Sequence, residues 1–242
     1  MTPAGAATRR RRVDLSSRLL KNLFSTTCGA VEGRGRVDLE KKLHQGLQAM
    51  GLELPAAARR QLVEYLRLLE KWNRAYNLTA VREIEQMVPR HLLDSLAALP
   101  WLKGPRIIDI GTGAGLPGIP LAVARPDLSF TLLDSNAKKI RFVTQAAHAL
   151  GLKNVAVVRE RAEKFQPEEK FDTLVTRAFA AIPDMLIATR HLCAPGGRFL
   201  ALKGVPPREE LAALPGGYRA EVQALDVPGL EAARHLIIIT RD

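Results

Sequence analysis

Apolar residues in the first part of the chain recur with the spacing of amphipathic helices. Steps of four, three and three residues, which place side chains on one face of a helix, separate Leu62, Leu66, Leu69 and Trp72. Residues 92–99 show a second pattern of this kind, after a short break at 77–80. Pro55 and Pro89 stand where prolines are tolerated in the first turn of a helix. We therefore expect residues 37–104 to be helical.

After Pro105 the pattern changes to short apolar or β-branched runs. The first four runs are 106–110, 129–133, 155–159 and 171–176. Helices are predicted between the first three, at 116–124 and 137–150, and this alternation is typical of a mostly parallel sheet with helices on both faces. Further strands are expected at 198–202 and 236–240 and a helix at 207–214, whereas 219–225 fits a strand or a loop. The sequence therefore predicts an α/β fold of the Rossmann-like type.

A glycine-rich turn follows the first predicted strand. Residues 109–118 read Asp-Ile-Gly-Thr-Gly-Ala-Gly-Leu-Pro-Gly. A Walker A loop is excluded because Leu-Pro-Gly replaces its Gly-Lys-Ser/Thr ending. The dinucleotide fingerprint G-x-G-x-x-G fits only when it begins at Gly113, and it then leaves Asp109 and Gly111 unexplained. The Glu/Asp-x-Gly-x-Gly-x-Gly turn of S-adenosylmethionine (SAM) methyltransferases accounts for Asp109, Gly111, Gly113 and Gly115, so SAM is the favoured ligand.

An acidic residue at the end of the second predicted strand supports this architecture. Asp134 follows the run 129–133, where Rossmann-like folds place the carboxylate that accepts the ribose hydroxyls. Because NAD and SAM folds share this carboxylate, it does not decide between the two ligands. The alternative is that Asp134 caps the helix that begins near Asn136.

The sequence lacks the residues that two common kinds of methyl transfer require. No Asn/Asp-Pro-Pro-aromatic turn, which holds an exocyclic amine, follows the fourth strand. Pyrimidine C5 methylation needs a nucleophilic cysteine, but Cys28 lies near the start of the chain and Cys193 is expected at an apolar helix end as an inert thiol. Methylation of guanine N7 needs neither the amine-holding turn nor a nucleophilic cysteine, because N7 already carries a free lone pair. Arg177, after the fourth strand, is the candidate to orient cofactor or substrate, with a structural ion pair or hydrogen bond as the alternative.

The positive charge is concentrated at the start of the chain. The protein has 242 residues with 36 Lys+Arg and 25 Asp+Glu, a net charge of +11, and eight of the basic and two of the acidic residues lie in 1–36. We interpret 1–36 as a flexible basic tail that could attract nucleic acid, with a targeting peptide or a misassigned start as alternatives. No apolar run of about 18 residues exists, and two cysteines suit a reducing cytoplasm.

Several ordered motifs resemble one family. They are Asn-Leu-Thr-Ala at 77–80, His-Leu-Leu-Asp-Ser-Leu at 91–96, the turn extended to Pro120, Leu-Asp-Ser at 133–135 with the lysines at 138–139, Arg-Ala-Glu at 161–163, Thr-Arg-Ala-Phe at 176–179 and Leu-Lys-Gly at 202–204. Together they are similar to the bacterial 16S rRNA guanine-N7 methyltransferase family, RsmG or glucose-inhibited division protein B. The resemblance covers about 39–242 and leaves out the tail.

The resemblance implies a class I SAM-dependent methyltransferase domain at 105–242, preceded by a helical extension at 37–104. It implies transfer of a methyl group from SAM to N7 of a guanine in 16S rRNA, within the small subunit or its precursor. Residues at positions where the family contacts the cofactor are Gly111, Leu116, Ala162, Glu163 and Arg177. Gly113 and Asp134 join them from the motif itself.

The candidates for RNA contact are basic or polar residues within or near these motifs: Asn77, Arg82, His91, Arg141, Arg177 and Lys203. His91 could equally be a structural histidine, and Glu163 without the family would be read as a solvated charge. We expect a monomer in the cytoplasm, with no metal and no membrane partner. The alternatives are a SAM methyltransferase acting on a small molecule or a protein, and an RNA-binding assembly factor without catalysis.

Overall fold

The computed structural model of the chain describes residues 38–177 and 180–241, and from Asp38 onward they belong to one compact unit. The expected tail, with Cys28, lies outside the described residues. No described helix is both long enough and apolar enough to span a bilayer.

A seven-stranded sheet runs through this unit in the order β3-β2-β1-β4-β5-β7-β6. The neighbours from β3 to β5 pair in parallel, whereas β7 is antiparallel to both β5 and β6. The strands are β1 (Arg106–Ile110), β2 (Ser129–Leu133), β3 (Val155–Val158), β4 (Phe171–Arg177), β5 (Cys193–Lys203), β6 (Tyr218–Leu225) and β7 (Arg234–Arg241).

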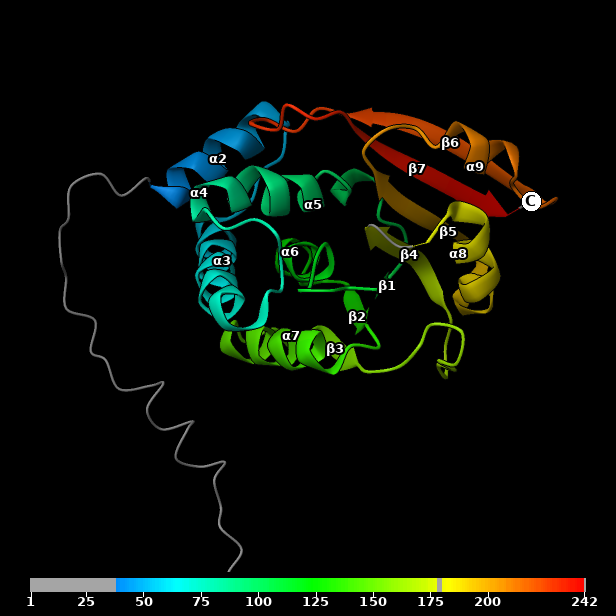
Figure 1. Cartoon of the computed structure of the whole chain (residues 1–242), viewed down its shortest axis with the longest axis horizontal. Helices are drawn as coiled ribbons and strands as arrows, with labels where there is room; N and C mark the ends of the chain where they lie inside the picture. The colour runs from blue at the N-terminus through cyan, green and yellow to red at the C-terminus, as the bar shows by residue number, and fades with distance from the viewer. Residues whose placement is uncertain (1–37, 178–179, 242) are drawn as a thin grey trace, which may run out of the picture. The chain divides into compact units, whose positions relative to one another are not determined.

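Helices precede and connect the strands (Figure 1). Those before β1 are α2 (Leu39–Ala49), α3 (Ala56–Tyr76), α4 (Ile84–Met87), the π-helix η1 (Val88–Leu93), α5 (Asp94–Leu96) and the 3₁₀ turn η2 (Leu99–Trp101). Those within the sheet region are α6 (Gly118–Ala124), α7 (Ala137–Ala149), α8 (Ile182–Thr189), the 3₁₀ turn η3 (Arg190–Leu192) and α9 (Arg208–Ala212).

The predicted fold class and strand order along the chain are confirmed. β1 and β2 have the expected bounds, and the ambiguous segment 219–225 forms the edge strand β6. Cys193 lies at a helix end as expected, since it is the C-cap of η3, but it also opens β5, which begins five residues before the predicted strand. The loop-like sequence Ala-Pro-Gly-Gly at 194–197 hid this start, since proline and glycine are poor strand formers.

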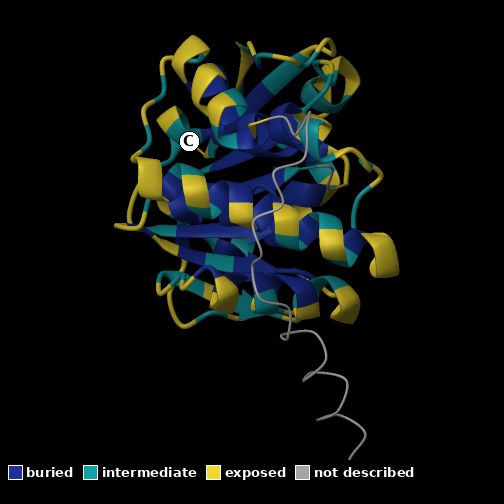
Figure 2. Ribbon diagram, turned by 90° about the vertical axis from the view of Figure 1, so that its left-hand side faces the viewer, coloured by how far each residue is buried: buried dark blue, intermediate teal, exposed yellow. Residues whose placement is uncertain are grey.

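Alternate residues of each strand face two separate cores. Ile107 of β1 belongs to a core shared with α2, α3, α6 and α7, whereas Ile108 and Ile110 belong to a second core under α8. This is the period-two alternation of a β-strand, here with both faces covered by helices. The strands between the two edge strands β3 and β6 are accordingly mostly buried, whereas the helices carry exposed residues on their outer faces (Figure 2).

The helices before β1 share the first of these cores with the sheet. Leu62, Leu66 and Leu69 of α3 are fully buried, as the spacing predicted, and belong to the same cluster as Phe130 of β2. Helix α3 ends at Asn77, which adopts a left-handed backbone conformation with φ of 51°. The predicted break at 77–80 therefore begins with a helix C-cap.

Replacing Gly46 by alanine should destabilise this shared core. A Cβ at Gly46 of α2 would collide with the side chain of Leu93 in η1, so we expect Gly46→Ala to lower the free energy of unfolding by about 1–3 kcal/mol. Urea denaturation would measure the change. The control is Gly216→Ala, since a Cβ there meets nothing within 4 Å. Equal stability of the two variants would contradict the packing described.

Candidate active site

A buried carboxylate anchors the glycine-rich turn. Asp109 of β1 is fully buried, and its Oδ2 accepts hydrogen bonds from the Thr112 hydroxyl at 2.6 Å and from the Gly118 N–H at 2.8 Å. Burial raises the pKa of Asp109 to about 6, while these two hydrogen bonds act in the opposite direction. The side chain thus ties the end of β1 to the first residue of α6.

The turn between these anchor points needs glycine. Gly111, Gly113 and Gly115 have φ of 69°, 62° and 88°, which side-chain-bearing residues rarely adopt. A Cβ on Gly115 would lie 2.5 Å from Ile119, whereas one on Gly113 would meet only the Gly111 carbonyl at 3.8 Å. The first part of the turn therefore leaves open space for a ligand against its backbone.

Asp134 faces this turn from the end of β2. Its Oδ2 accepts from the Gly113 N–H at 3.0 Å and its Oδ1 from the Asn136 N–H at 2.8 Å. The cap of α7 is Asn136, whose side-chain oxygen accepts from the N–H groups of Lys138 and Lys139. The alternative in which Asp134 caps this helix is therefore wrong.

A cavity of about 280 Å³, here named the cofactor cavity, opens beside these groups. It is lined by Ile110, Gly111, Leu133, Asp134, Ser135, Lys139, Glu160, Arg161, Ala162 and Glu163. Four of the predicted cofactor residues thus meet at the ends of β1, β2 and β3. A carboxylate at Asp134, with the apolar side chains of Ile110, Leu133 and Ala162 beside it, fits the ribose and adenine of SAM.

The remaining predicted cofactor residues lie outside this lining. Gly113 faces it through its hydrogen bond with Asp134, and Leu116 is buried in the first core. Arg177 lines a second cavity instead. Lys139 also lines the cofactor cavity, a position that was not predicted although it lies five residues after Asp134 on the following helix.

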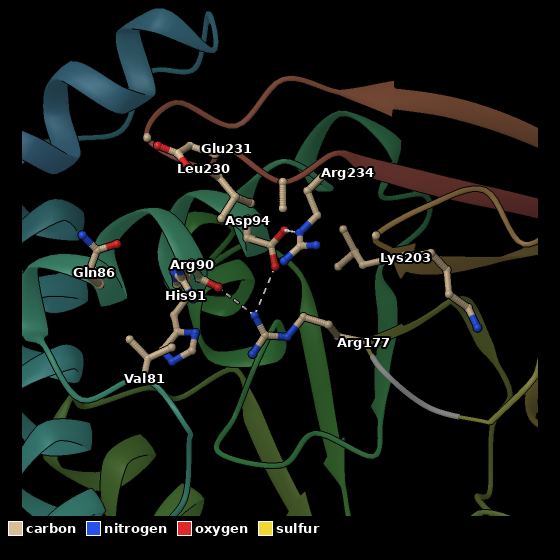
Figure 3. A pocket seen from close by; sticks show the side chains of 14 residues that line it. Val81, Gln86, Arg90, His91, Asp94, Arg177, Lys203, Leu230, Glu231 and Arg234 are labelled. Carbon is tan, nitrogen blue, oxygen red and sulfur yellow. Dashed lines mark hydrogen bonds and ion pairs between the residues drawn. The ribbon is translucent and has the colours of Figure 1, made fainter.

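The second cavity measures about 930 Å³ and carries four cationic side chains; we name it the basic cavity (Figure 3). Its charged residues are Arg90, Asp94, Arg177, Lys203, Glu231 and Arg234. They come from η1, α5, the carboxyl ends of β4 and β5, the start of β7 and the segment before it. Because β7 is antiparallel to β5, Arg234 and Lys203 reach the same edge of the sheet.

Asp94 holds two of these arginines. Its Oδ2 pairs with Nη1 of Arg177 at 3.2 Å and its Oδ1 with Nε of Arg234 at 2.8 Å, while Arg177 also donates to the Arg90 carbonyl at 3.1 Å (Figure 3). Asp94 is only 1% exposed. Arg177 therefore makes the ion pair considered as the alternative, and it also lines the basic cavity.

His91 lies in the wall of the basic cavity and is neutral at pH 7. Burial, and then the Arg177 charge, lower its pKa to about 4. Its Nε2 lies 2.9 Å from the Thr79 hydroxyl oxygen, which itself accepts from the Val81 N–H. The side chain thus links the 77–80 motif to the cavity.

The other RNA candidates lie at three separate places in the structure. Arg82 donates to the Asn77 side chain at 2.9 Å, so this pair stabilises the end of α3. Lys203 pairs with Glu210 at 3.1 Å and lines the basic cavity. Arg141 is exposed on α7 and lines neither cavity. Their roles in RNA contact stay predictions.

Neither a metal centre nor a cysteine nucleophile is present at these cavities in the described residues. No group of three or more candidate metal ligands occurs among residues 38–177 and 180–241. Cys193 begins β5, at the end of the strand opposite Lys203, and burial raises the pKa of its thiol to about 11. An unreactive thiol agrees with the prediction made for it.

The fold and the turn define a class of enzyme. A parallel sheet completed by one antiparallel strand, with a glycine-rich turn after β1 and an acidic residue after β2, is the class I SAM-dependent methyltransferase. The fold resembles a SAM-dependent methyltransferase from Aquifex aeolicus, with a TM-score of 0.50 and 17% identity, over 73% of this chain and 97% of that one.

The family follows from closer relatives. A family model, rRNA small subunit methyltransferase G, matches residues 58–237. Ribosomal RNA small subunit methyltransferase G of Serratia proteamaculans is 54% identical over 203 residues, 83% of this chain and 98% of the relative. The protein of the same name from Laribacter hongkongensis is 54% identical over 202 residues, with the same coverage. The chain belongs to the rRNA small subunit methyltransferase G family, and the resemblance seen in the sequence is confirmed.

Replacing Asp134 by asparagine should weaken cofactor binding. The change removes a charged acceptor from the cofactor cavity, so we expect the Kd for S-adenosylhomocysteine, measured by calorimetry, to rise roughly 10-fold or more. Asp127→Asn is the control, because Asp127 is exposed and pairs with Arg125. A Kd within about twofold of the wild type would rule out this role for Asp134.

Because His91 is buried and neutral, the free energy of unfolding should fall in mild acid. Its folded pKa lies below the unfolded value near 6.5, so the unfolded state binds more protons and the stabilisation is lost as the pH falls toward 4. From pH 7 to pH 5 we expect the wild type to lose about 2 kcal/mol more unfolding free energy than His91→Gln. The exposed His148→Gln should follow the wild type in urea titrations; identical pH profiles of wild type and His91→Gln would refute the assignment.

Proposed function

We propose that this methyltransferase transfers the methyl group of SAM to N7 of a guanine in 16S rRNA, in the small subunit or its precursor. The observation that carries the proposal is the basic cavity beside Arg177. It has the volume to receive a nucleotide, and its arginines and lysine suit a phosphate backbone. The relatives named ribosomal RNA small subunit methyltransferase G support the same substrate.

The chemistry assigned to the chain is positioning rather than proton transfer. SAM supplies a methyl group on a sulfonium sulfur; the N7 lone pair forms the new bond while the carbon–sulfur bond breaks, and the positive charge passes to the purine. No proton leaves N7, so no general base is needed. His91, neutral and held by Thr79, is suited to hydrogen bonding. Asp94 holds Arg177 and Arg234 in fixed directions at the cavity wall.

Further features belong to the same proposal. Arg177 ends β4, and β4 lies between β1, which ends at the cofactor cavity, and β5, which ends at the basic cavity. We also propose that the protein is a monomer and that it acts in the cytoplasm on assembling subunits. Asn77, Arg82 and Arg141 would contact RNA outside the cavities.

The decisive assay is transfer of radiolabelled methyl from SAM to small subunits from cells that lack the endogenous enzyme, followed by chromatography of the nucleosides. We expect label in 7-methylguanosine of 16S rRNA. S-adenosylhomocysteine binding without transfer to subunits or naked rRNA would favour a small-molecule or protein acceptor. Neither binding nor transfer would favour an assembly factor without catalysis.

Within this assay Asp94→Asn should lower kcat/KM for the subunit at least about 10-fold. One side-chain oxygen is lost as an acceptor, and the two arginines no longer share a buried negative charge. The Kd for S-adenosylhomocysteine should stay within twofold, because Asp94 does not line the cofactor cavity. Asp127→Asn again serves as the matched control, and unchanged kcat/KM in Asp94→Asn would exclude the positioning role.

A further inference from the structure

A tyrosine from the helices before the sheet contacts the glycine-rich turn directly. The hydroxyl of Tyr65 on α3 donates a 2.7 Å hydrogen bond to the carbonyl oxygen of Ala114, 49 residues later in the chain. Tyr65 is fully buried. Ala114 lies between Gly113 and Gly115, both with positive φ. The bond therefore acts on the most irregular part of the turn.

The carbonyl of Ala114 is available because of the buried carboxylate of β1. If the helix began one turn earlier, the N–H of Gly118 would donate to the carbonyl four residues before it, which is that of Ala114, but Gly118 is the first residue of α6 and its N–H has no acceptor within that helix. Here that N–H donates to Asp109 instead. A buried carbonyl without a partner would cost free energy, and the Tyr65 hydroxyl supplies the partner.

The Tyr65 ring packs beside helix α7 in the first core. It lies 6.2 Å from the ring of Phe142 on α7, between ring centroids, at an interplanar angle of 44°. Helix α7 follows Asp134 by three residues, so Tyr65 contacts both the turn after β1 and the helix after β2. Burial raises the pKa of its phenol further above the usual value, which keeps the hydroxyl proton in place as a donor.

We propose that Tyr65 is a positioning residue for SAM binding. Its hydroxyl sets the Ala114 peptide, which keeps the Gly113 N–H on Asp134 and the open side of the turn toward the cofactor cavity. It follows that α3 is part of the cofactor site as well as of the core. The inference rests on the SAM assignment and is independent of which acceptor is methylated.

The test is Tyr65→Phe in the full chain, with S-adenosylhomocysteine as the probe. We expect calorimetry to give a five- to tenfold higher Kd at unchanged stoichiometry, and kinetics to give a higher KM for SAM with little change in KM for the subunit. Tyr76→Phe, on the same helix with its exposed ring stacked on Trp72, should bind like the wild type.

A packing variant separates the hydrogen bond from the core. Phe142→Leu removes the ring beside Tyr65 and leaves the hydroxyl, so it should lower the thermal midpoint while its Kd stays within twofold. A normal Kd in Tyr65→Phe, or an equal rise in Phe142→Leu, would overturn the proposal, as would a wild type that does not bind the probe. A wild type that binds the probe but yields no 7-methylguanosine would instead remove the proposed substrate and leave the role of Tyr65 standing.

Discussion

The carboxyl-terminal edge of the sheet is organised by the burial of Asp109. A charge in an apolar interior is costly unless hydrogen bonds satisfy it, and here the Thr112 hydroxyl and the Gly118 N–H both donate to one oxygen, while the other has no partner among the described residues. These hydrogen bonds hold the end of β1 against the start of α6. The backbone between them therefore turns sharply, with positive φ at Gly111, Gly113 and Gly115. The form of the turn, the Ala114 carbonyl that accepts from Tyr65 and the hydrogen bond from the Gly113 N–H to Asp134 all depend on this arrangement.

Asp94 has the corresponding role at the neighbouring cavity. It lies just after the π-helix η1, a helical form that is often found at functional sites. Through this segment His91, Asp94 and the Arg90 carbonyl reach one cavity, where Arg177 meets two of them. Two buried carboxylates thus hold the two cavities in shape: Asp109 of β1 holds the turn beside the cofactor cavity, and Asp94 holds Arg177 and Arg234 in the basic cavity.

The sequence predicted those features whose signals are local. Alternation and β-branched residues marked β1 and β2 with their bounds, and the spacing of Leu62, Leu66 and Leu69 marked the buried face of α3. Asp134 was found because its distance from the turn is set by one strand and one helix. Contacts across long separations gave no such signal: Arg234 reaches Asp94 over 140 residues, and a tyrosine at a buried helix position reads as an ordinary core residue. The start of β5 was not predicted, because proline and glycine at 195–197 are poor strand formers.

The order of the strands has a consequence for the newly made protein. β7 is synthesised after β6, yet it lies between β5 and β6 and carries Arg234 to the basic cavity. Until it is synthesised, β6 has no neighbour in the sheet and the cavity lacks one wall, although the turn and the strands around the cofactor cavity are already complete. The cofactor cavity can therefore form before β7 is made, whereas the basic cavity is complete only after β7 has paired with β5.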